Sequence, residues 1–357
     1  MKVYIRFLSF LFLKSFILVF SIMLSLVFIL NILSEIDFFK NLPVEKYYPI
    51  YIALLNSPSL IFEMFPYIFL ISTQLFFINL FNNNEIQIFK YSGLKNINIL
   101  AIIGFITFLL SIFIIFFYYS FSSTFKKYYL EIKNEYSTDG KYLAVITNNG
   151  LWIKDMVDDK INIINSLKID ENFLLETFIT QFDKDFNILR NISSDKIDIK
   201  NKLWKIYNAE IFENNLVSKN NELEILTNFD YDQIQNLFSD LSSLSLLELI
   251  DLKNNYLKLN YSTTEIDIQI NKVFSYPLYL TIMTILASTI MLNTKAFKSS
   301  TVKITFGLFL SVVIYYFNNF FNVLGNTEKI NLIYSVWLPL IFLTFINLIM
   351  INKINDK

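Results

Sequence analysis

The sequence contains no cysteine and no histidine. Without cysteine the chain forms no disulfide and no thiolate site, and without histidine it lacks the commonest general base and metal ligand. Catalytic triads and zinc sites in their usual forms are therefore excluded. A carboxylate-only metal or acid/base site stays open, but no motif points to one, so we expect no metal.

Glycine is also rare, with 6 residues in a chain of 357. The phosphate-binding motif GxxxxGK[ST] is absent, and so few glycines leave little room for any nucleotide loop. We therefore expect no cofactor and no enzymatic activity in this chain. If ATP drives its function, another chain has to hydrolyse it.

Charged residues make up only 17% of the sequence, and the net charge is -1. This balance gives no electrostatic preference for nucleic acid. In contrast, 54% of the residues are hydrophobic and the mean hydropathy is +0.46. These values exceed those of ordinary soluble domains and predict a membrane protein.

Six apolar stretches are long enough to cross a bilayer, which takes about 20 residues. The first follows positive charges but is longer than the apolar core of a signal peptide and lacks a small-residue cleavage site, so we interpret it as a retained helix. The predicted spans are 7–33, 59–82, 97–121, 273–293, 302–323 and 332–351.

The distribution of Lys and Arg over the short loops predicts the orientation, since cytoplasmic loops are enriched in them. Only Lys40, Lys46 and Lys329 fall in the short connections on one side. The other side, which we predict to be cytoplasmic and to hold both termini, carries Lys2, Arg6, Lys14, Lys90, Lys95, Lys295, Lys298, Lys303, Lys353 and Lys357. Residues 122–271 then form a large domain on the outer, periplasmic side.

This inserted segment has the pattern of an all-β domain. Residues 196–200 alternate between apolar and polar side chains, which is the period of a half-buried strand. An antiparallel sandwich or jelly roll suits a segment of this length. Leucines at helical spacing near 230–258 predict amphipathic helices that return the chain to the membrane. We predict strands within 141–146, 151–155, 160–169, 178–183, 188–199 and 203–213. The predicted domains are thus 1–121 (three spans), 122–271 (periplasmic β domain) and 272–357 (three spans).

Between the second and third spans lies a short predicted helix, near 83–94. Its apolar positions include Ile86, Ile88, Phe89 and Leu94, and Gly93 suits a helix end that needs a positive φ. Two interpretations are open on physical grounds: an interfacial helix on the membrane surface, or a coupling helix that docks into a cytoplasmic ATPase.

Several segments resemble the LptF/LptG family of lipopolysaccharide-export permeases. Glu85, Ile86 and the Ser92–Leu94 stretch are similar to the family's short cytoplasmic helix, and Gly150–Asp155 ("GLWIKD") resembles a strand typical of the LptG branch. Further resemblances follow in order along the chain, at Pro66, Glu248, Leu249, Lys272, Pro277, Trp337 and Pro339. Two departures stand out: Tyr91 replaces a small residue before Ser92, and Met156 replaces the glycine that normally follows the strand motif.

The resemblance implies one permease subunit of an ABC exporter in the inner membrane, most like LptG. Its implied partners are an LptB-like ATPase dimer, a second six-span LptF-like permease, an LptC-like protein and a periplasmic bridge protein. Family members extract lipopolysaccharide from the membrane and pass it through a β-jelly-roll domain toward the outer membrane. An LptF-type subunit of the same exporter is the alternative within the family.

The candidate site residues fall into two groups. For ATPase coupling they are Glu85, Ile86, Phe89, Lys90, Gly93 and Leu94. For the lipid, apolar side chains of the first helix would form a wall that contacts the acyl chains: Phe20, Leu24, Val27, Phe28 and Ile32. The phosphates would be bound by Lys40, Lys46 and Lys272. The acidic residues Glu35 and Asp37 would reduce the positive potential near Lys40. Lys40 is equally well interpreted as an interfacial anchor, Lys272 as a helix anchor, and Asp37 as a membrane-boundary charge.

Two other classes of protein compete with the transporter hypothesis. A membrane-anchored periplasmic ligand-binding or sensor protein does not need six spans. It would also need a cytoplasmic output domain, for which the predicted cytoplasmic segments are too short. An intramembrane enzyme would need ionisable residues deep in the spans, and these are scarce. Asn318, Asn319 and Asn322 in the fifth span are explained by interhelical hydrogen bonds.

Overall fold

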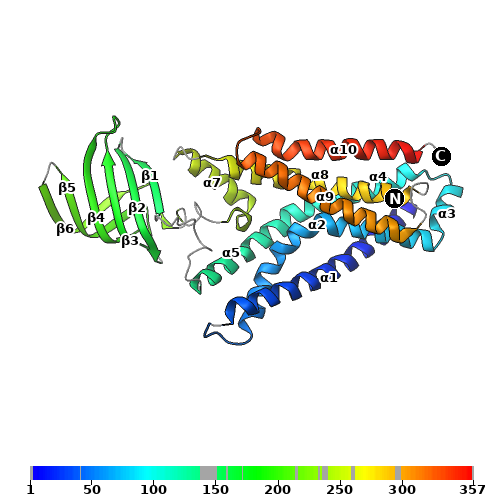
Figure 1. Cartoon of the computed structure of the whole chain (residues 1–357), viewed down its shortest axis with the longest axis horizontal. Coiled ribbons are helices and arrows are strands. Elements are labelled where there is room, and N and C mark those ends of the chain that lie inside the picture. The colour runs from blue at the N-terminus through cyan, green and yellow to red at the C-terminus, as the bar shows by residue number, and fades with distance from the viewer. Residues whose placement is uncertain are drawn as a thin grey trace. The chain divides into compact units, whose positions relative to one another are not determined.

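The computed structural model describes residues 3–40, 42–136, 151–157, 160–170, 172–213, 216–231, 234, 240–258, 262–293 and 299–355. The chain divides into two compact units. Met1–Tyr129 and Thr264–Lys357 form a helical unit, and Leu130–Thr263 form a second unit that contains the β-sheet (Figure 1). The two units are described separately below.

Within the described residues, six helices are long and apolar enough to cross a membrane, which agrees with the six predicted spans. The third span is continuous through a six-residue π-helix, η1 (Ile114–Tyr119), which joins α4 (Asn96–Phe113) to α5 (Ser120–Glu135). The others are α1 (Val3–Phe39), α2 (Tyr48–Asn82), α8 (Thr264–Leu292), α9 (Ser300–Asn326) and α10 (Leu332–Asn355). A seven-residue helix, α3 (Glu85–Tyr91), lies between α2 and α4.

The centre of the helical unit is formed by α2 and α8. More than half of the apolar window of each is buried, against 17% for α1 and 22% for α9. Aromatic rings fill the interface of α1 with α2: the Phe16 and Phe69 centroids lie 4.9 Å apart and those of Phe12 and Phe76 lie 5.9 Å apart. Because α1 and α9 keep most of their apolar surface exposed within the single chain, they are the helices available to lipid or to another membrane subunit.

The β unit contains a six-stranded antiparallel sheet, which confirms the predicted all-β insert. Each strand is hydrogen-bonded to the next in sequence, so the described strands form one meander. The strands are β1 (Leu151–Val157), β2 (Lys160–Asp170), β3 (Phe173–Phe182), β4 (Ile188–Asp198), β5 (Leu203–Glu213) and β6 (Leu216–Leu226). The strand predicted at 141–146 lies outside the described residues.

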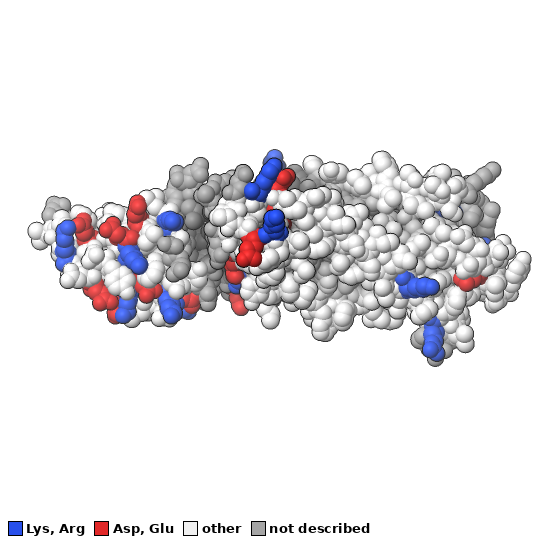
Figure 2. All heavy atoms as spheres, turned by 90° about the horizontal axis from the view of Figure 1, so that it is seen from below, with Lys and Arg blue, Asp and Glu red and all other residues white. Residues whose placement is uncertain are grey.

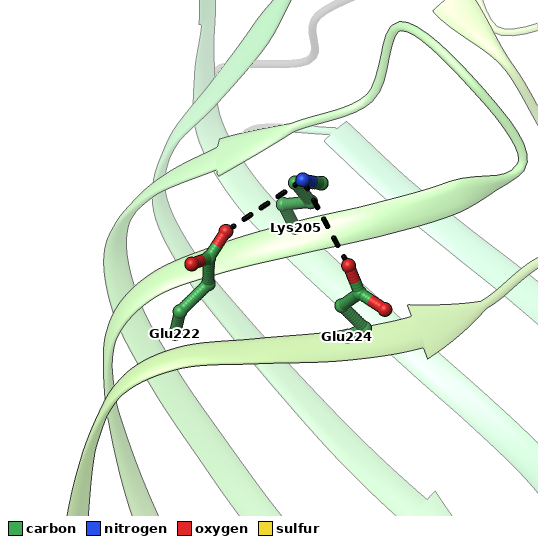
Figure 3. Close-up of polar contacts among 3 residues, drawn as sticks. All are labelled: Lys205, Glu222 and Glu224. Atoms are coloured by element: carbon green, nitrogen blue, oxygen red, sulfur yellow. Dashed lines mark ion pairs between the residues drawn. The ribbon is translucent and has the colours of Figure 1, made fainter.

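Strand β6 is absent from the sequence prediction because its side chains are mostly polar and exposed. In the described sheet it forms an edge, held to β5 by surface charges. Lys205 on β5 lies 3.8 Å from both Glu222 and Glu224 on β6 (Figure 3). Exposed pairs of this kind contribute about 0–1 kcal/mol each, but charges along an edge strand also oppose uncontrolled pairing with other sheets.

The segment after the sheet packs back onto it. The Trp204 indole nitrogen donates a hydrogen bond to the carbonyl oxygen of Phe229 at 2.8 Å, and both side chains are buried. Helix α7 (Leu246–Lys258) follows a short 3-10 turn, η2 (Leu241–Ser243). A capping box begins it: the Ser245 amide donates to Glu248 Oε2 at 2.7 Å and the Glu248 amide donates to Ser245 Oγ at 3.4 Å. Helix α7 lies within the segment 230–258, for which amphipathic helices were predicted, whereas residues 232–233 and 235–239 are not described.

Charge is distributed very differently over the two units. Figure 2 shows Lys, Arg, Asp and Glu crowded over the β unit, whereas the helical unit presents a broad uncharged surface in the same view. A surface without charge over helices of this length is what a hydrocarbon environment requires.

Candidate functional site

Helix α3 ends in the way that its glycine predicts. Gly93 has a φ of +76°, its amide donates to the carbonyl of Lys90 at 3.0 Å, and the amide of Leu94 donates to the carbonyl of Phe89 at 2.9 Å. These two bonds form a Schellman motif, which satisfies the last carbonyls of the helix and turns the chain toward α4. No atom lies within 4 Å of a Cβ built on Gly93, so the backbone conformation alone calls for glycine here.

The two faces of α3 differ sharply. Ile86 is buried, and Phe89 and Leu94 pack against the same core cluster of the helical unit. On the outward side Lys90 is exposed, Ile88 is 58% exposed and Tyr91 is 89% exposed. Ile88 is thus not part of the packed face, contrary to the sequence pattern. The outward face of α3 therefore presents two large apolar side chains beside a cation.

A groove of about 500 Å³ separates α3 from the first turns of α1. The Phe7 and Phe89 rings face each other across it, with centroids 6.1 Å apart. Oε2 of Glu85 is buried without a hydrogen-bond partner among the described residues, while Oε1 accepts a bond from Asn83 Nδ2 at 3.5 Å. The groove is lined by Val3, Tyr4, Phe7, Glu85, Ile88, Phe89, Ser92 and Leu94. A carboxylate oxygen that lacks a donor costs free energy, so this position suits a cationic or amide partner.

The C-terminal end of α1 is anchored to its neighbours by buried polar groups. Asn31 Nδ2 donates to the carbonyl of Ala53 at 2.8 Å, and Asn56 Nδ2 donates to Asn31 Oδ1 at 3.2 Å. Glu35 is 1% exposed and its Oε1 accepts a hydrogen bond from the Tyr129 hydroxyl at 3.0 Å. The sequence suggested that Glu35 lies near Lys40 and reduces its potential. In the structure, Glu35 is instead buried and hydrogen-bonded to Tyr129.

The predicted lipid-contact residues are distributed over several elements. Phe28 and Ile32 lie one turn apart on α1 and are half-buried, whereas Val27 is buried in the core cluster. Lys40 directly follows the last residue of α1, and Lys46 lies in the loop before α2; both are exposed. The structure thus places Val27 in the core and packs Phe20 against it, and it leaves Leu24, Phe28 and Ile32 at least partly exposed on α1.

Lys272 lies on α8, in the middle of a polar group that sequence reasoning overlooked. Glu63 on α2 interacts electrostatically with Lys272, and the Tyr276 hydroxyl donates a hydrogen bond to the carbonyl of Phe62. The signal in the sequence was clear, because Glu63 is the one acidic residue within the six predicted spans. Tyr279 on α8 also lies near Asn318 on α9.

A second polar junction fixes α9. Gln74 on α2 is 1% exposed, and its Nε2 donates to the carbonyl of Lys303 at 3.2 Å. Lys303 is itself 5% exposed, and its ammonium donates to the carbonyl of Met291 at 2.6 Å and lies 5.1 Å from the Phe81 ring centroid. Lys303 therefore holds the end of α8 and is not a free loop cation.

One face of the β-sheet carries a continuous row of isoleucines. The register pairs Ile153 with Ile164, Ile164 with Ile179, Ile179 with Ile192 and Ile192 with Ile211. All five are at most 6% exposed. Alternation along each strand directs them to one side, where they form an apolar strip across five strands.

A buried carboxylate closes one end of this face. Asp155 on β1 is 0% exposed and accepts hydrogen bonds from the side-chain and backbone nitrogens of Asn228, at 2.8 and 3.2 Å. Burial raises the pKa of Asp155 above its ordinary value, although both hydrogen bonds from Asn228 act in the opposite direction. Asp155 belongs to the "GLWIKD" motif, so this motif has a structural role here: it ties β1 to the segment after β6.

Metal binding has no support within the part of the chain that the structure describes, where no three Asp or Glu side chains gather suitably for an ion. The fold instead defines a class of membrane protein: six spans, interrupted after the third by a β domain with a continuous apolar face, and a short helix between the second and third. This is the architecture of a polytopic transport permease.

Comparison with protein families makes the assignment specific. The family model described as lipopolysaccharide export system permease LptF/LptG matches residues 6–353, which is nearly the whole chain. The chain therefore belongs to the LptF/LptG family. A search of curated proteins gives no match. Family membership makes this chain a multi-pass inner-membrane permease of the lipopolysaccharide export system rather than an enzyme.

Proposed function

We propose that this chain is the LptG-type permease subunit of an ATP-driven lipopolysaccharide exporter. It extracts lipopolysaccharide from the inner membrane and passes it to a periplasmic bridge toward the outer membrane. The family match supports the transport role. The preference for LptG over LptF rests on the resemblance of Gly150–Asp155 to the LptG strand motif.

Helix α3 is the observation that carries the ATP-driven part of this proposal. Its inner face is anchored in the core through Ile86, Phe89 and Leu94, while Ile88 and Tyr91 are exposed. A rigid helix with an apolar outer face transmits force when it docks into a groove of a partner. The unsatisfied oxygen of Glu85 favours a partner that offers a cation there. We assign this docking to an LptB-like ATPase dimer on separate chains, at the cytoplasmic side.

The lipid would be held by apolar walls and cations of the helical unit. Phe28 and Ile32 on the surface of α1 suit acyl chains, and Lys40, Lys46 and Lys272 suit phosphate groups. With the termini cytoplasmic, as the Lys and Arg distribution predicts, Lys40 and Lys46 lie at the outer headgroup level.

The exposed apolar sides of α1 and α9 favour a second membrane subunit. The exposed side chains include Ile22, Leu26 and Leu33 on α1 and Phe309 and Phe320 on α9. We assign this surface to an LptF-like six-span permease and an LptC-like helix, with bilayer lipid covering the remainder.

Two experiments test the proposal. Depletion of the chain should trap lipopolysaccharide at the inner membrane, and purification in detergent should recover an LptB-like ATPase and a second six-span permease by mass spectrometry. Normal surface delivery after depletion would refute the transport role.

The coupling role has its own test. Glu85→Lys should reduce recovery of the ATPase while membrane insertion persists. Glu45→Lys serves as a matched control, because Glu45 is exposed in the loop between α1 and α2, on the other predicted side of the membrane. Equal ATPase recovery with both variants would argue against coupling through α3.

A further inference from the structure

Helix α2 continues through Pro66 with one helical hydrogen bond missing, and α8 supplies a substitute donor. Proline has no amide hydrogen, so the carbonyl four residues earlier, that of Phe62, loses its helical donor. The Tyr276 hydroxyl of α8 donates a hydrogen bond to that carbonyl. The Phe62 and Tyr276 rings also stack, with centroids 4.7 Å apart and an interplanar angle of 22°. The two central helices are thus joined at a defined point.

Two opposite charges lie at the same point. Glu63 directly follows Phe62 on α2, and Lys272 lies one helical turn before Tyr276 on α8. Glu63 is within electrostatic reach of both Lys272 and Tyr276. With a rise of about 1.5 Å per residue, Glu63 lies roughly 23 Å from the first residue of α2 and Lys272 roughly 12 Å from that of α8. Glu63 therefore lies inside the predicted span 59–82, whereas Lys272 directly precedes the predicted span 273–293.

A carboxylate inside a membrane span is costly unless it faces protein or a hydrated path, and such residues commonly mark the route of a substrate. Glu63 is exposed in the single chain, while Lys272 is half-buried. The carboxylate therefore lies on an open side of the α2–α8 junction, from which the ammonium can also be approached.

We propose that Glu63 is the internal counter-charge of Lys272, which holds this ammonium when no substrate is present and yields it to an anionic phosphate of the bound lipid. The inference rests on the proposed function and adds a residue that determines specificity. Exchange of one anion for another means that binding breaks an existing interaction, so the net affinity stays moderate. Moderate affinity suits a site that has to release its ligand onward.

The test measures binding of fluorescent lipopolysaccharide to the detergent-purified complex of the full chain and its co-purifying subunits. Removal of the competing carboxylate by Glu63→Gln should tighten binding by about fivefold, the size expected for a partly exposed pair. Lys272→Gln should weaken binding by a similar factor, and Glu63→Asp should stay near wild type. With dephosphorylated lipopolysaccharide, Glu63→Gln should bind no more tightly than wild type, because the phosphate that replaces the carboxylate is absent.

The directions of these effects separate the proposal from a purely structural role. If the pair only fixed α2 against α8, Glu63→Gln and Lys272→Gln would both weaken binding and would both lower the melting temperature. That result, or an unchanged affinity in Glu63→Gln, would overturn the inference while leaving the proposed function intact. A complex of wild-type chain that does not bind lipopolysaccharide saturably would contradict the proposed function itself and, with it, this inference.

Discussion

Substitution of Gly307 by alanine should destabilise the helical unit through one specific collision. Gly307 on α9 faces Gln74 on α2, and an added Cβ would lie 2.1 Å from Gln74 Nε2 and 3.1 Å from its Cδ. Real Cβ atoms do not approach other atoms so closely, so the amide has to move. Gln74 is almost fully buried, and its Nε2 donates to the Lys303 carbonyl at 3.2 Å, so displacement also breaks a hydrogen bond.

The expected cost follows from three contributions. Overpacking of a filled interior costs about 1–3 kcal/mol. The lost hydrogen bond adds about 1 kcal/mol. Alanine recovers at most about 1 kcal/mol through its higher helix propensity. Gly307→Ala should therefore lower the stability of the helical unit by about 1–3 kcal/mol.

A second substitution isolates the cause. Gln74→Ala is itself destabilising, since it removes a buried side chain, but it also leaves room for a methyl group at position 307. The double variant should therefore be more stable than the sum of the single effects by about 2 kcal/mol. Gly104→Ala is the matched control, because its Cβ would lie 3.7 Å from Ile285 Cδ1, which is ordinary contact. This control should be neutral or slightly stabilising.

The assay is the apparent melting temperature of the purified chain in one detergent, at one scan rate, since membrane proteins commonly unfold irreversibly and only the order of variants is then meaningful. Two results would refute the reasoning: a Gly307→Ala variant as stable as wild type, or single effects that add in the double variant. Either would mean that α9 does not pack on Gln74 as described.

Three further predictions concern α3 and the β unit. Alanine at position 93 should cost about 1–2 kcal/mol, because a side chain with a Cβ is strained at this positive φ, and Gly93→Ala should therefore reduce recovery of the ATPase. Gly93→Asn should reduce it less, because asparagine tolerates a positive φ better. ATPase recovery equal to that of the wild type in both variants would contradict this. Trp204→Phe should lower the β unit's stability by about 1–3 kcal/mol, because it leaves part of a fully buried indole site empty and removes one of the two donors to the Phe229 carbonyl, the other being the Thr227 hydroxyl. Trp152→Phe, at an exposed position, is the control for thermal unfolding. The pKa of Asp155 is raised in the folded state, so the folded β unit binds this proton more tightly than the unfolded chain does. The free energy of unfolding should therefore fall as the pH rises from the pKa of Asp155 in the unfolded state to its pKa in the folded state. In thermal unfolding between pH 3 and pH 7, Asp155→Asn should flatten this slope, and an unchanged slope would exclude Asp155 as its source.

The separation between predictable and unpredictable features is clearest at α3. Gly93 could be assigned its positive φ from the sequence, because a helix end followed by glycine is a local pattern. The exposure of Ile88 could not, because which side of a two-turn helix packs on the bundle depends on the helices that surround it. The empty hydrogen-bonding position of Glu85 is likewise a property of its neighbours.

The β unit shows the same division. Alternation identified the strands that bury one face, such as 188–199, and the capping residues at Ser245 and Glu248 lie in a helix that leucine spacing predicted. Strand β6 escaped, because an edge strand with polar side chains on both faces has no period-two pattern. The order of the strands was not predicted from the sequence, since the length of the segment suits a jelly roll as well as a meander.

By itself, the sequence determined the six spans, the position of the inserted all-β segment and the absence of histidine and cysteine chemistry. These follow from composition and short-range periodicity, which every segment carries within itself. Only the tertiary structure decided which polar groups meet: Tyr276 with the Phe62 carbonyl, Glu35 with Tyr129, and Gln74 with the backbone of α9. It also decided that Glu63 lies within electrostatic reach of Lys272. The reason is physical, because a buried polar group is satisfied by whichever neighbour the packing of helices brings to it, and that neighbour can be hundreds of residues away.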